Sequence, residues 1–434
     1  MPGPPCASDD DARLRVALLT YRGNPQSGGQ GVYTHYLSRE LAALGHRVTV
    51  YSGPPYPELA PDVPLVKVPS LDLYRPEDPF RTPGRDEFRD LVDIVEFAIM
   101  CAAGFPEPLT FSLRARRLLR ARRNQIDIVH DNQCLGYGIR GLVGDGFPLV
   151  ATVHHPITVD RALELAQAES WRRRLNIRRW YGFLRMQKRV VRALPRILTV
   201  SESSARDICR DMGASPDRLA VVPVGVDTAL FRPLPQVARV PGRLLTTASA
   251  DVPLKGLLPL LEAVAKVRTE RHAELVIVGR PKPGSAVPAT IERLGLEDAV
   301  TLAGVVSAER LVELYAEAEV AVVPSLYEGF SLPAVEAMAC GVPLVCTTGG
   351  ALPEVVGRGG DTALLVPPND PGALAAAIVR ALDDAALRRR LARAGRARVV
   401  ERFSWRATAE ATVEQYREVI AAARGRAGHG GRPC

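Results

Sequence analysis

Two series of short apolar segments, each interrupted by stretches with helical periodicity, constrain the fold of this 434-residue chain more than any other feature. The first series covers residues 14–20, 47–51, 126–130, 149–153, 196–200 and 219–222. The second covers residues 244–248, 274–278, 300–303, 320–323, 344–347 and 363–366, with helices expected notably at 256–268, 308–318 and 332–340. Apolar strands that alternate with helices are typical of parallel sheets covered on both faces. The sequence therefore predicts an α/β protein with two doubly wound, Rossmann-like parallel-sheet domains.

The proline-rich segment 223–241 separates the two series and predicts the joint between the domains. A chain of this length exceeds one ordinary core, which also favours two domains of roughly 200 residues each. The expected parts are a disordered N-terminus (1–13), an N-terminal domain (14–237), a C-terminal domain (238–404), a helix returning toward the first domain (405–424) and a flexible tail (425–434). Residues 54–104 are rich in proline and receive no assignment. The two domains should face a cleft that holds the ligand.

The stretch from residue 323 to 343 carries two carboxylates, Glu328 and Glu336, around a predicted strand-to-helix turn. Pro333 fits the first turn of the helix, where proline costs no hydrogen bond. The N–H groups at such a helix start lack intrahelical partners and suit a phosphate, while the carboxylates would accept hydrogen bonds from sugar or ribose hydroxyls. Turns of this kind also occur in α/β proteins without a ligand, so both interpretations stay open at this point.

A second glycine-rich turn, with Gly28, Gly29 and Gly31, follows the first predicted strand and opens a helix. Loops at the carboxyl ends of strands are the ligand-binding positions of open α/β sheets. The dinucleotide fingerprint requires a third glycine that this turn lacks, which disfavours nicotinamide binding. The turn therefore indicates a binding edge without naming the ligand.

The net charge of +8 arises from two basic runs, residues 111–123 and 171–192, neither of which contains an acidic residue. The second run interleaves its basic residues with aromatic ones, among them Trp171 and Trp180. Such a stretch suits an anionic membrane surface or an acidic acceptor, and it equally suits a solvated helix face with a packed apolar side. Nucleic acid is disfavoured because no recognition motif accompanies the charge.

The expected location is the cytoplasm, with peripheral attachment at the inner face of the membrane as a further option. Residues 1–12 have no basic and apolar leader, and the apolar stretch 91–104 is too short to span a bilayer and contains Asp93 and Glu96. Seven scattered cysteines without a Cys-x-x-Cys pair disfavour a disulfide framework or a zinc site.

Residues 328–343 resemble the Glu-x7-Glu signature of the family 4 glycosyltransferases, which are retaining enzymes of the GT-B fold. Further landmarks agree in order and spacing: residues 27–31, 222–227 at the joint, Lys255-Gly256, Gly349-Gly350 with Pro353-Glu354, and 403–405. The likeness covers nearly the whole chain and is strong in the second domain. It implies two Rossmann-like domains that face a cleft and an enzyme that transfers a sugar.

The resemblance also implies a role for each candidate residue. Glu336 would hold the ribose hydroxyls of a nucleotide-sugar donor, and Glu328 would lie near the transferred sugar. Lys255 would bind the diphosphate together with backbone groups and stabilise the charge that develops on the leaving group. The other donor-binding candidates are Gly329, Phe330, Ser331, Leu332, Gly28, Gly29, Gly31, Ser249 and, near the base, Val305.

In the first domain, residues 150–154 resemble the strand end whose histidine faces the donor sugar. This favours His154 over the adjacent His155 as a catalytic residue, although a histidine at a strand end satisfied by the backbone remains the alternative. Two positions depart from the family pattern. Relatives usually carry an arginine where this chain has Ser249, so one phosphate-binding cation is missing or comes from elsewhere, and Val224 stands where asparagine is common.

The predicted reaction moves a hexosyl unit from a nucleoside diphosphate sugar to an acceptor hydroxyl with retention at the anomeric carbon. The donor is a co-substrate, and neither a metal nor another cofactor is expected. A lipid-linked or cell-envelope glycan and a small molecule are the acceptors considered. Two alternatives are a nucleotide-sugar epimerase of similar two-domain fold and a non-catalytic nucleotide-sugar-binding protein.

Overall fold

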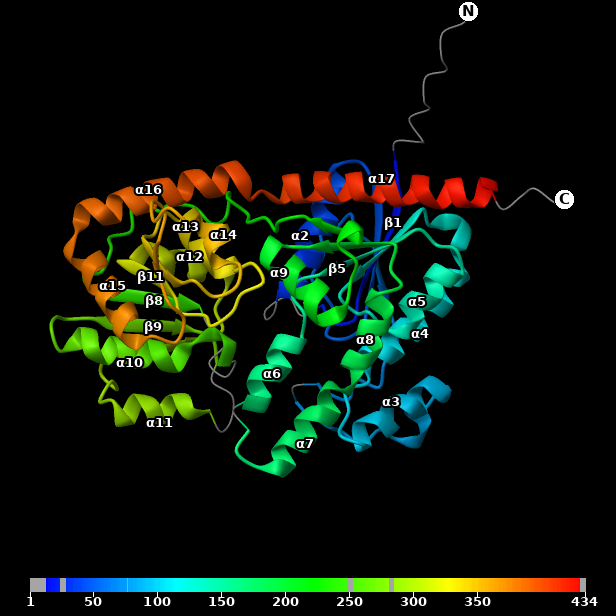
Figure 1. The fold of residues 1–434 in the computed structure, drawn as a ribbon, viewed down its shortest axis with the longest axis horizontal. Coiled ribbons are helices and arrows are strands. Elements are labelled where there is room, and N and C mark those ends of the chain that lie inside the picture. Colours follow the sequence, from blue (N-terminus) through cyan, green and yellow to red (C-terminus); the bar gives the residue numbers. More distant parts are fainter. Residues whose placement is uncertain are drawn as a thin grey trace, which may run out of the picture. The chain divides into compact units, whose positions relative to one another are not determined.

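The computed structural model describes residues 13–23, 29–75, 77–166, 168–247, 253–280 and 285–429. The chain forms two compact units (Figure 1). The first comprises Met1–Thr199, Ala205–Val222 and Thr408–Cys434, and the second comprises Val200–Ser204 and Pro223–Ala407. The short segment Val200–Ser204 therefore belongs to the second unit, although it directly follows a strand of the first.

The first unit is built on a parallel seven-stranded sheet with the strand order β3-β2-β1-β4-β5-β6-β7. Its strands are β1 (Arg15–Thr20), β2 (Arg47–Ser52), β3 (Leu65–Lys67), β4 (Ile128–Asn132), β5 (Leu149–Val153), β6 (Arg196–Thr199) and β7 (Leu219–Val221). Its helices are α2 (Gly29–Ala43), α3 (Leu91–Cys101), α4 (Glu107–Arg120), α5 (Tyr137–Gly144), α6 (Thr158–Ala166), α7 (Trp171–Trp180) and α8 (Leu184–Val191), and α9 (Glu202–Asp207) extends into it from the second unit. α4, α5 and α8 bury Phe111, Leu142 and Val190 in the core beside the sheet.

The second unit is built on a parallel six-stranded sheet with the order β10-β9-β8-β11-β12-β13. Its strands are β8 (Arg243–Thr247), β9 (Glu274–Val278), β10 (Val300–Gly304), β11 (Val320–Val323), β12 (Leu344–Thr347) and β13 (Leu364–Val366). Its helices are α10 (Leu257–Arg268), α11 (Ala286–Arg293), α12 (Ala308–Glu317), α13 (Leu332–Ala339), α14 (Leu352–Val356), α15 (Pro371–Asp383) and α16 (Ala385–Arg402), and α17 (Trp405–His429) begins here and continues into the first unit. Leu260, Ile277 and Ile378 lie in its apolar core.

Short helical turns complete the structure. They are η1 (Arg85–Glu87), η2 (Arg123–Gln125), η3 (Tyr181–Phe183), the π-helical η4 (Ile208–Met212), η5 (Pro216–Arg218) and η6 (Pro253–Lys255). Among the described residues, every helix is too short or too polar to cross a bilayer.

The predicted fold class is confirmed, because all twelve apolar segments form strands within two residues of their expected limits. Two elements were missed. The unassigned stretch 54–104 contains the edge strand β3 and the helix α3. After β6, the α-helix ends at Asp207 and the chain continues as the π-helical η4.

Candidate active site

The carboxyl edge of the second sheet brings three loops together. β8 and β11 are neighbours, and later strands are added outward from each of them, so the topological switch point lies between them. Open α/β sheets bind ligands outside the carboxyl ends of the strands at this point. Lys255 follows β8, Glu328 follows β11, and Gly349-Gly350 follows β12.

Lys255 and Glu328 form the charged centre of this edge. The Lys255 Nζ donates to Glu328 Oε1 at 2.8 Å, and the Ser325 hydroxyl donates to the same oxygen at 2.7 Å. The Glu328 side chain is buried, whereas Lys255 is partly exposed. The ammonium group is therefore held in place before any anion arrives, which is the condition for strong electrostatic stabilisation.

Ser331, the N-cap of α13, has an unusual conformation. Its φ of 94° lies in the left-handed region that residues with a side chain seldom adopt. The residue is only 4% exposed, and within the described part of the chain its hydroxyl has no hydrogen-bond partner. In the same part of the chain, the backbone N–H groups of Gly329, Phe330 and Ser331 donate no hydrogen bond. A buried hydroxyl without a partner, next to unpaired N–H groups on a strained backbone, indicates a ligand that accepts these hydrogen bonds.

The Glu328 loop is fixed by close backbone contacts on two sides. Leu326 N donates to Leu254 O at 2.6 Å, and Ala351 N donates to Glu328 O at 2.8 Å. Glycine is required at both contacts, because an added Cβ would lie 2.0 Å from Pro324 O at Gly256 and 2.2 Å from Glu328 O at Gly350. The strand ends thus hold the loop rigidly.

Gly256→Ala tests this close approach. The substitution adds a clash with Pro324 to the cost of a side chain at a φ of 63°, so we expect it to destabilise the protein by about 2 kcal/mol or more. Gly295→Ala is the matched control, since Gly295 has a φ of 62° and no atom within 4 Å of the position that a Cβ would take. The control should cost only about 1 kcal/mol. Equal shifts in urea unfolding midpoints would contradict a clash at Gly256.

Two serines of the short segment Val200–Ser204 hold the turn that carries Gly329. Ser201 and Ser204 donate from their hydroxyls to Gly329 O at 2.7 and 3.2 Å. Ser201 also accepts a hydrogen bond from Ser204 N at 3.0 Å, which makes it the cap of α9. Because Gly329 O points to these hydroxyls and the peptide bond is planar, the N–H of Phe330 is oriented the other way. The sequence did not predict this contact.

Glu336 lies on α13, partly buried beside Tyr315. Its Oε2 is 3.5 Å from the Tyr315 hydroxyl. Burial raises the pKa of Glu336 to about 7, although Tyr315 and the positive charge of Lys255 act in the opposite direction. A carboxyl with this pKa is partly protonated at neutral pH. Hydrogen bonds donated by the hydroxyls of a ligand would favour its ionised form.

The remaining donor-binding candidates differ in what they can contribute. Phe330 is buried and packs edge-on against Phe403, with ring centroids 5.4 Å apart, so only its backbone can face a ligand. Leu332 is the first residue of α13. Val305 is exposed and follows β10, two strands away from β8 on the same edge. Gly28 and Ser249 lie outside the described residues.

The first unit has its own polar group at the carboxyl ends of β4 and β5. His154 follows β5, and its backbone N–H donates to Gln133 Oε1 at 2.7 Å. Its Nε2 lies 2.8 Å from Asn132 Oδ1, and the Asn132 amide nitrogen donates to Gln30 O and the Thr34 hydroxyl. This orientation of Asn132 places the proton of His154 on Nε2. Burial, and to a lesser extent His155, lowers the pKa of His154 to about 3, so the ring is neutral.

A chain of buried hydrogen bonds lies behind His154. The His130 ring contacts the Tyr416 hydroxyl at 2.6 Å and the Thr152 hydroxyl at 2.7 Å, and Thr152 contacts the Tyr33 hydroxyl at 3.0 Å. The Tyr33 ring meets the His154 ring edge-on at 4.8 Å. Burial lowers the pKa of His130 to about 3, so this interior carries no extra charge. The polar run 130–133 at the end of an apolar strand was the signal that could have identified Asn132 and Gln133.

The two described glycines of the first loop begin α2. Gly29 is its first residue and has no atom within 4 Å of the place a Cβ would take, whereas Gly31 is buried. Both glycines follow β1, and β1 is the neighbour of β4 in the sheet. They therefore lie at the switch point of the first unit. His155, the rejected neighbour of His154, instead contacts Asp160 Oδ2 through Nε2 at 3.0 Å.

Comparison with known proteins identifies the family. Residues 27–230 match the model described as Glycosyltransferase Family 4, and residues 241–384 match the model described as Glycosyl transferases group 1. The chain is 55% identical over 409 residues to an MMP alpha-(1->4)-mannosyltransferase of Mycolicibacterium hassiacum, covering 94% of this chain and 99% of the relative. The chain belongs to glycosyltransferase family 4. This glycosyltransferase is also 32% identical to a D-inositol 3-phosphate glycosyltransferase of Kineococcus radiotolerans, over 94% and 95% of the two chains.

Solved structures agree with the fold. Sucrose-phosphate synthase from Thermosynechococcus elongatus matches with a TM-score of 0.74 and 25% identity, over 94% of this glycosyltransferase and 100% of that chain. Anabaena Alr3699/HepE in complex with UDP and glucose matches with a TM-score of 0.65 and 18% identity, over 93% and 99%. The predicted GT-B class and the prediction of an enzyme that transfers sugar are confirmed.

The two basic runs of the glycosyltransferase lie in different environments. In the first run, on α4, Arg114 is buried, Arg116 pairs with Asp145 and Arg117 pairs with Asp90. In the second run, the arginines of α7 are exposed, and no described carboxylate pairs with them. Carboxylates of the first unit thus neutralise much of the charge of the first run. Contact of either run with a membrane stays a prediction.

Proposed function

We propose that this glycosyltransferase transfers a mannosyl unit from a nucleoside diphosphate sugar to the O4 hydroxyl of a sugar acceptor, with retention of the α configuration. The name of the relative at 55% identity, an alpha-(1->4)-mannosyltransferase, supports mannose and the α-(1→4) bond. The complex of HepE with UDP and glucose supports a nucleotide-sugar donor on this fold. In the structure itself, the observation that carries the proposal is the Ser331 turn beside Lys255. Among the described residues, its buried Ser331 hydroxyl and its N–H groups have no hydrogen-bond partner.

The second unit would hold the donor. Its diphosphate would accept hydrogen bonds from the N–H groups of Gly329 to Ser331 and from the Ser331 hydroxyl, with Lys255 as the balancing cation. Ionised Glu336 would accept the two ribose hydroxyls, and Glu328 would accept a hydroxyl of the transferred sugar. As the bond from C1 to the phosphate oxygen breaks, its electron pair moves onto the diphosphate, and Lys255 stabilises that charge.

The acceptor would then attack on the leaving-group face. A bond forms between C1 and O4 of the acceptor, and the acceptor proton passes to an oxygen of the departing diphosphate, which preserves the α configuration. Neutral His154, whose Nε2 donates to Asn132 Oδ1, is the residue predicted to face the transferred sugar. Lys255 and the N-terminus of α13 would balance the negative charge of the diphosphate. We therefore still predict a reaction that needs no metal.

A panel of nucleoside diphosphate sugars, each with and without an α-mannoside acceptor, tests the proposal. We expect the mannose donor to release nucleoside diphosphate fastest, to depend on the acceptor, and to give an α-(1→4) linkage by NMR. A new sugar epimer formed from donor alone would identify an epimerase instead. Donor binding without turnover across the acceptor panel would favour the non-catalytic alternative.

A further inference from the structure

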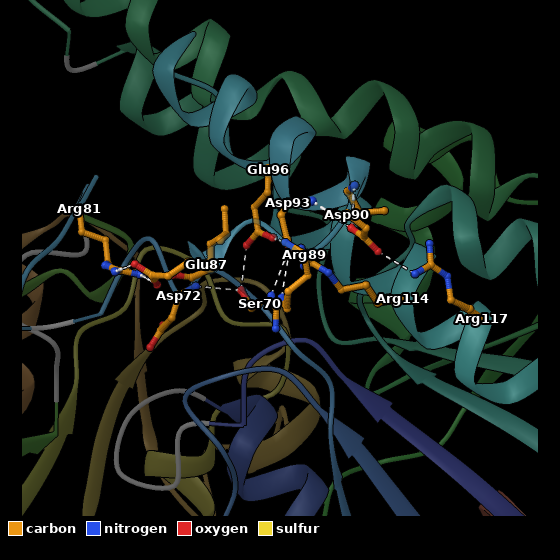
Figure 2. Close-up of polar contacts among 12 residues, drawn as sticks. Ser70, Asp72, Arg81, Glu87, Arg89, Asp90, Asp93, Glu96, Arg114 and Arg117 are labelled. Atoms are coloured by element: carbon orange, nitrogen blue, oxygen red, sulfur yellow. Dashed lines mark hydrogen bonds and ion pairs between the residues drawn. The ribbon is translucent and has the colours of Figure 1, made fainter. Parts of the chain in front are cut away.

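The helix α3 has its polarity reversed relative to an ordinary surface helix. Its two carboxylates, Asp93 and Glu96, are each 1% exposed and face inward (Figure 2). Leu91 and Ile94, in contrast, are 77% and 53% exposed, and Val95 is also exposed. A surface helix normally buries its apolar side chains and exposes its charges, so an outward apolar face calls for a covering partner.

The inward face of α3 is a closed network of charges. Arg114 of α4 is 6% exposed and contacts both Asp93 Oδ1 and, at 2.5 Å, Glu96 Oε2. Arg89 donates to both Asp93 oxygens at 3.0 Å, and the Ser70 hydroxyl donates to Glu96 Oε1 at 2.8 Å. Figure 2 shows these side chains converging from α3, α4 and the segment before α3. These contacts fix the rotation of α3 and thereby hold its apolar residues outward.

More than half of the large apolar side chains that are exposed, among the described residues, belong to a few neighbouring elements. Among the described residues, eleven large apolar side chains are exposed, and six of them belong to α3, to α7 or to the segment that precedes α3. These six are Leu91, Ile94, Val95, Trp171, Leu175 and Phe80. Scattered exposed apolar residues need no explanation, but such a concentration indicates an interaction surface.

α3 and α7 meet at their C-terminal ends. A Cβ on Gly104, just after α3, would lie 2.8 Å from Ile99 and 3.8 Å from Arg179 O of α7. The Trp180 ring at the end of α7 lies 5.1 Å from Phe105 and 6.4 Å from Phe80. The C-terminal ends of the two helices therefore adjoin, and we name the exposed apolar residues of both helices the α3–α7 face.

The α3–α7 face lies beyond the carboxyl edge of the first sheet. α4 leads back to the start of β4, so its first residue, Glu107, is at the carboxyl edge, where it pairs with Arg22 just after β1. α3 comes before α4, and α7 in the same way comes before α8, which returns to the start of β6. The face thus adjoins the edge at which the first unit carries His154.

The charge of the face decides which partner fits. α7 carries five arginines and no acidic residue: Arg172, Arg173, Arg174, Arg178 and Arg179. A second copy, placed symmetrically on the same face, would bring these like charges together. A bilayer with anionic lipids instead attracts the arginines and accepts apolar and tryptophan side chains without a complementary shape.

We propose that the α3–α7 face docks on an anionic lipid surface, with Leu91, Ile94 and Trp171 inserted among the headgroups and the arginines of α7 at the phosphates. The network around Arg114 supplies the fixed orientation of α3 on which insertion depends. Docking would place the acceptor side of the first unit at the lipid surface. It requires no nucleotide sugar, so its test is independent of the proposed reaction.

Vesicle sedimentation of the full chain tests the docking. We expect binding to phosphatidylcholine vesicles that contain phosphatidylglycerol at low salt, release at high salt, and no binding to phosphatidylcholine alone. The double variant Leu91→Glu and Ile94→Glu should weaken binding at least about tenfold. The matched control, Leu258→Glu and Val400→Glu, makes the same change in net charge at exposed positions of the second unit and should bind as the parent does.

Three results would overturn the proposal. The first is an absence of binding to anionic vesicles at low salt. The second is equal loss of binding in the test and control variants, which would reduce the effect to net charge. The third is a dimer, detected by light scattering without lipid, that the Leu91→Glu and Ile94→Glu variant dissociates, because the face would then belong to a second copy. Unchanged thermal unfolding of the test variant confirms that it is folded.

Discussion

Lys255→Ala should lower the kcat of sugar transfer by roughly 100-fold to 1,000-fold, the usual effect of removing one fixed electrostatic stabiliser of a leaving group. The Lys255 ammonium lies 2.8 Å from Glu328 beside the Ser331 turn, so its charge is in place before bond breaking. The loss should appear mainly in kcat, because charge on the diphosphate grows in the transition state. Initial rates over a range of donor concentrations with saturating acceptor measure it.

Two variants make this result specific to Lys255. Lys266→Ala removes a lysine near the end of α10 in the same unit and should leave the rate within about twofold of the parent. Lys255→Arg keeps the charge but changes its shape, and should recover part of the rate. A Lys255→Ala enzyme with parental kcat and a raised KM alone would show that Lys255 binds the donor equally in ground and transition states.

Local patterns were sufficient for most of the fold and for placing the predicted site residues of the second unit at strand ends. An apolar strand followed by a turn and a helix is a signal within about 20 residues, and Lys255, Glu328 and Ser331 all lie at such junctions. The rule that ligands bind at the carboxyl ends of parallel strands then brings them to one edge without knowledge of their contacts. The choice of His154, at the end of β5, came instead from the resemblance of residues 150–154 to the family.

Partners that are distant in sequence were not predictable in this way. Ser201 and Ser204 bind Gly329 O across more than 120 residues, and Tyr416 reaches His130 across 286. Nothing in the local sequence distinguishes a serine that caps its own helix from one that also fixes a remote turn. The chain must close its tertiary contacts before these roles exist, and a single sequence does not specify such pairings.

α3 shows the same limit most clearly. Its sequence has apolar residues on every side and two carboxylates three residues apart, a pattern that predicts neither a strand nor an ordinary amphipathic helix. The rotation of the helix is decided by Arg114, which belongs to α4 and sits between Asp93 and Glu96. Because Arg114 pairs with both carboxylates, burying Asp93 and Glu96 costs less free energy than burying them without a cation.

Arg114→Leu should therefore destabilise the protein by about 3–5 kcal/mol, the usual cost of leaving a buried charge without its partner. Two carboxylates would remain in the interior, where Arg89 still donates to Asp93 and Ser70 still donates to Glu96. Urea unfolding followed by tryptophan fluorescence measures the change, since Trp180 packs beside Phe105, which lies just before α4.

Arg117→Leu is the matched control on the same helix. Arg117 has a side chain that is 69% exposed and pairs with Asp90 at 2.7 Å, so its removal should cost less than about 1 kcal/mol. Equal unfolding midpoints for the two variants would mean that α3 is held by apolar contacts and not by its buried charges. A large difference would mean that charge pairing alone orients α3, which is the condition that keeps Leu91 and Ile94 at the surface.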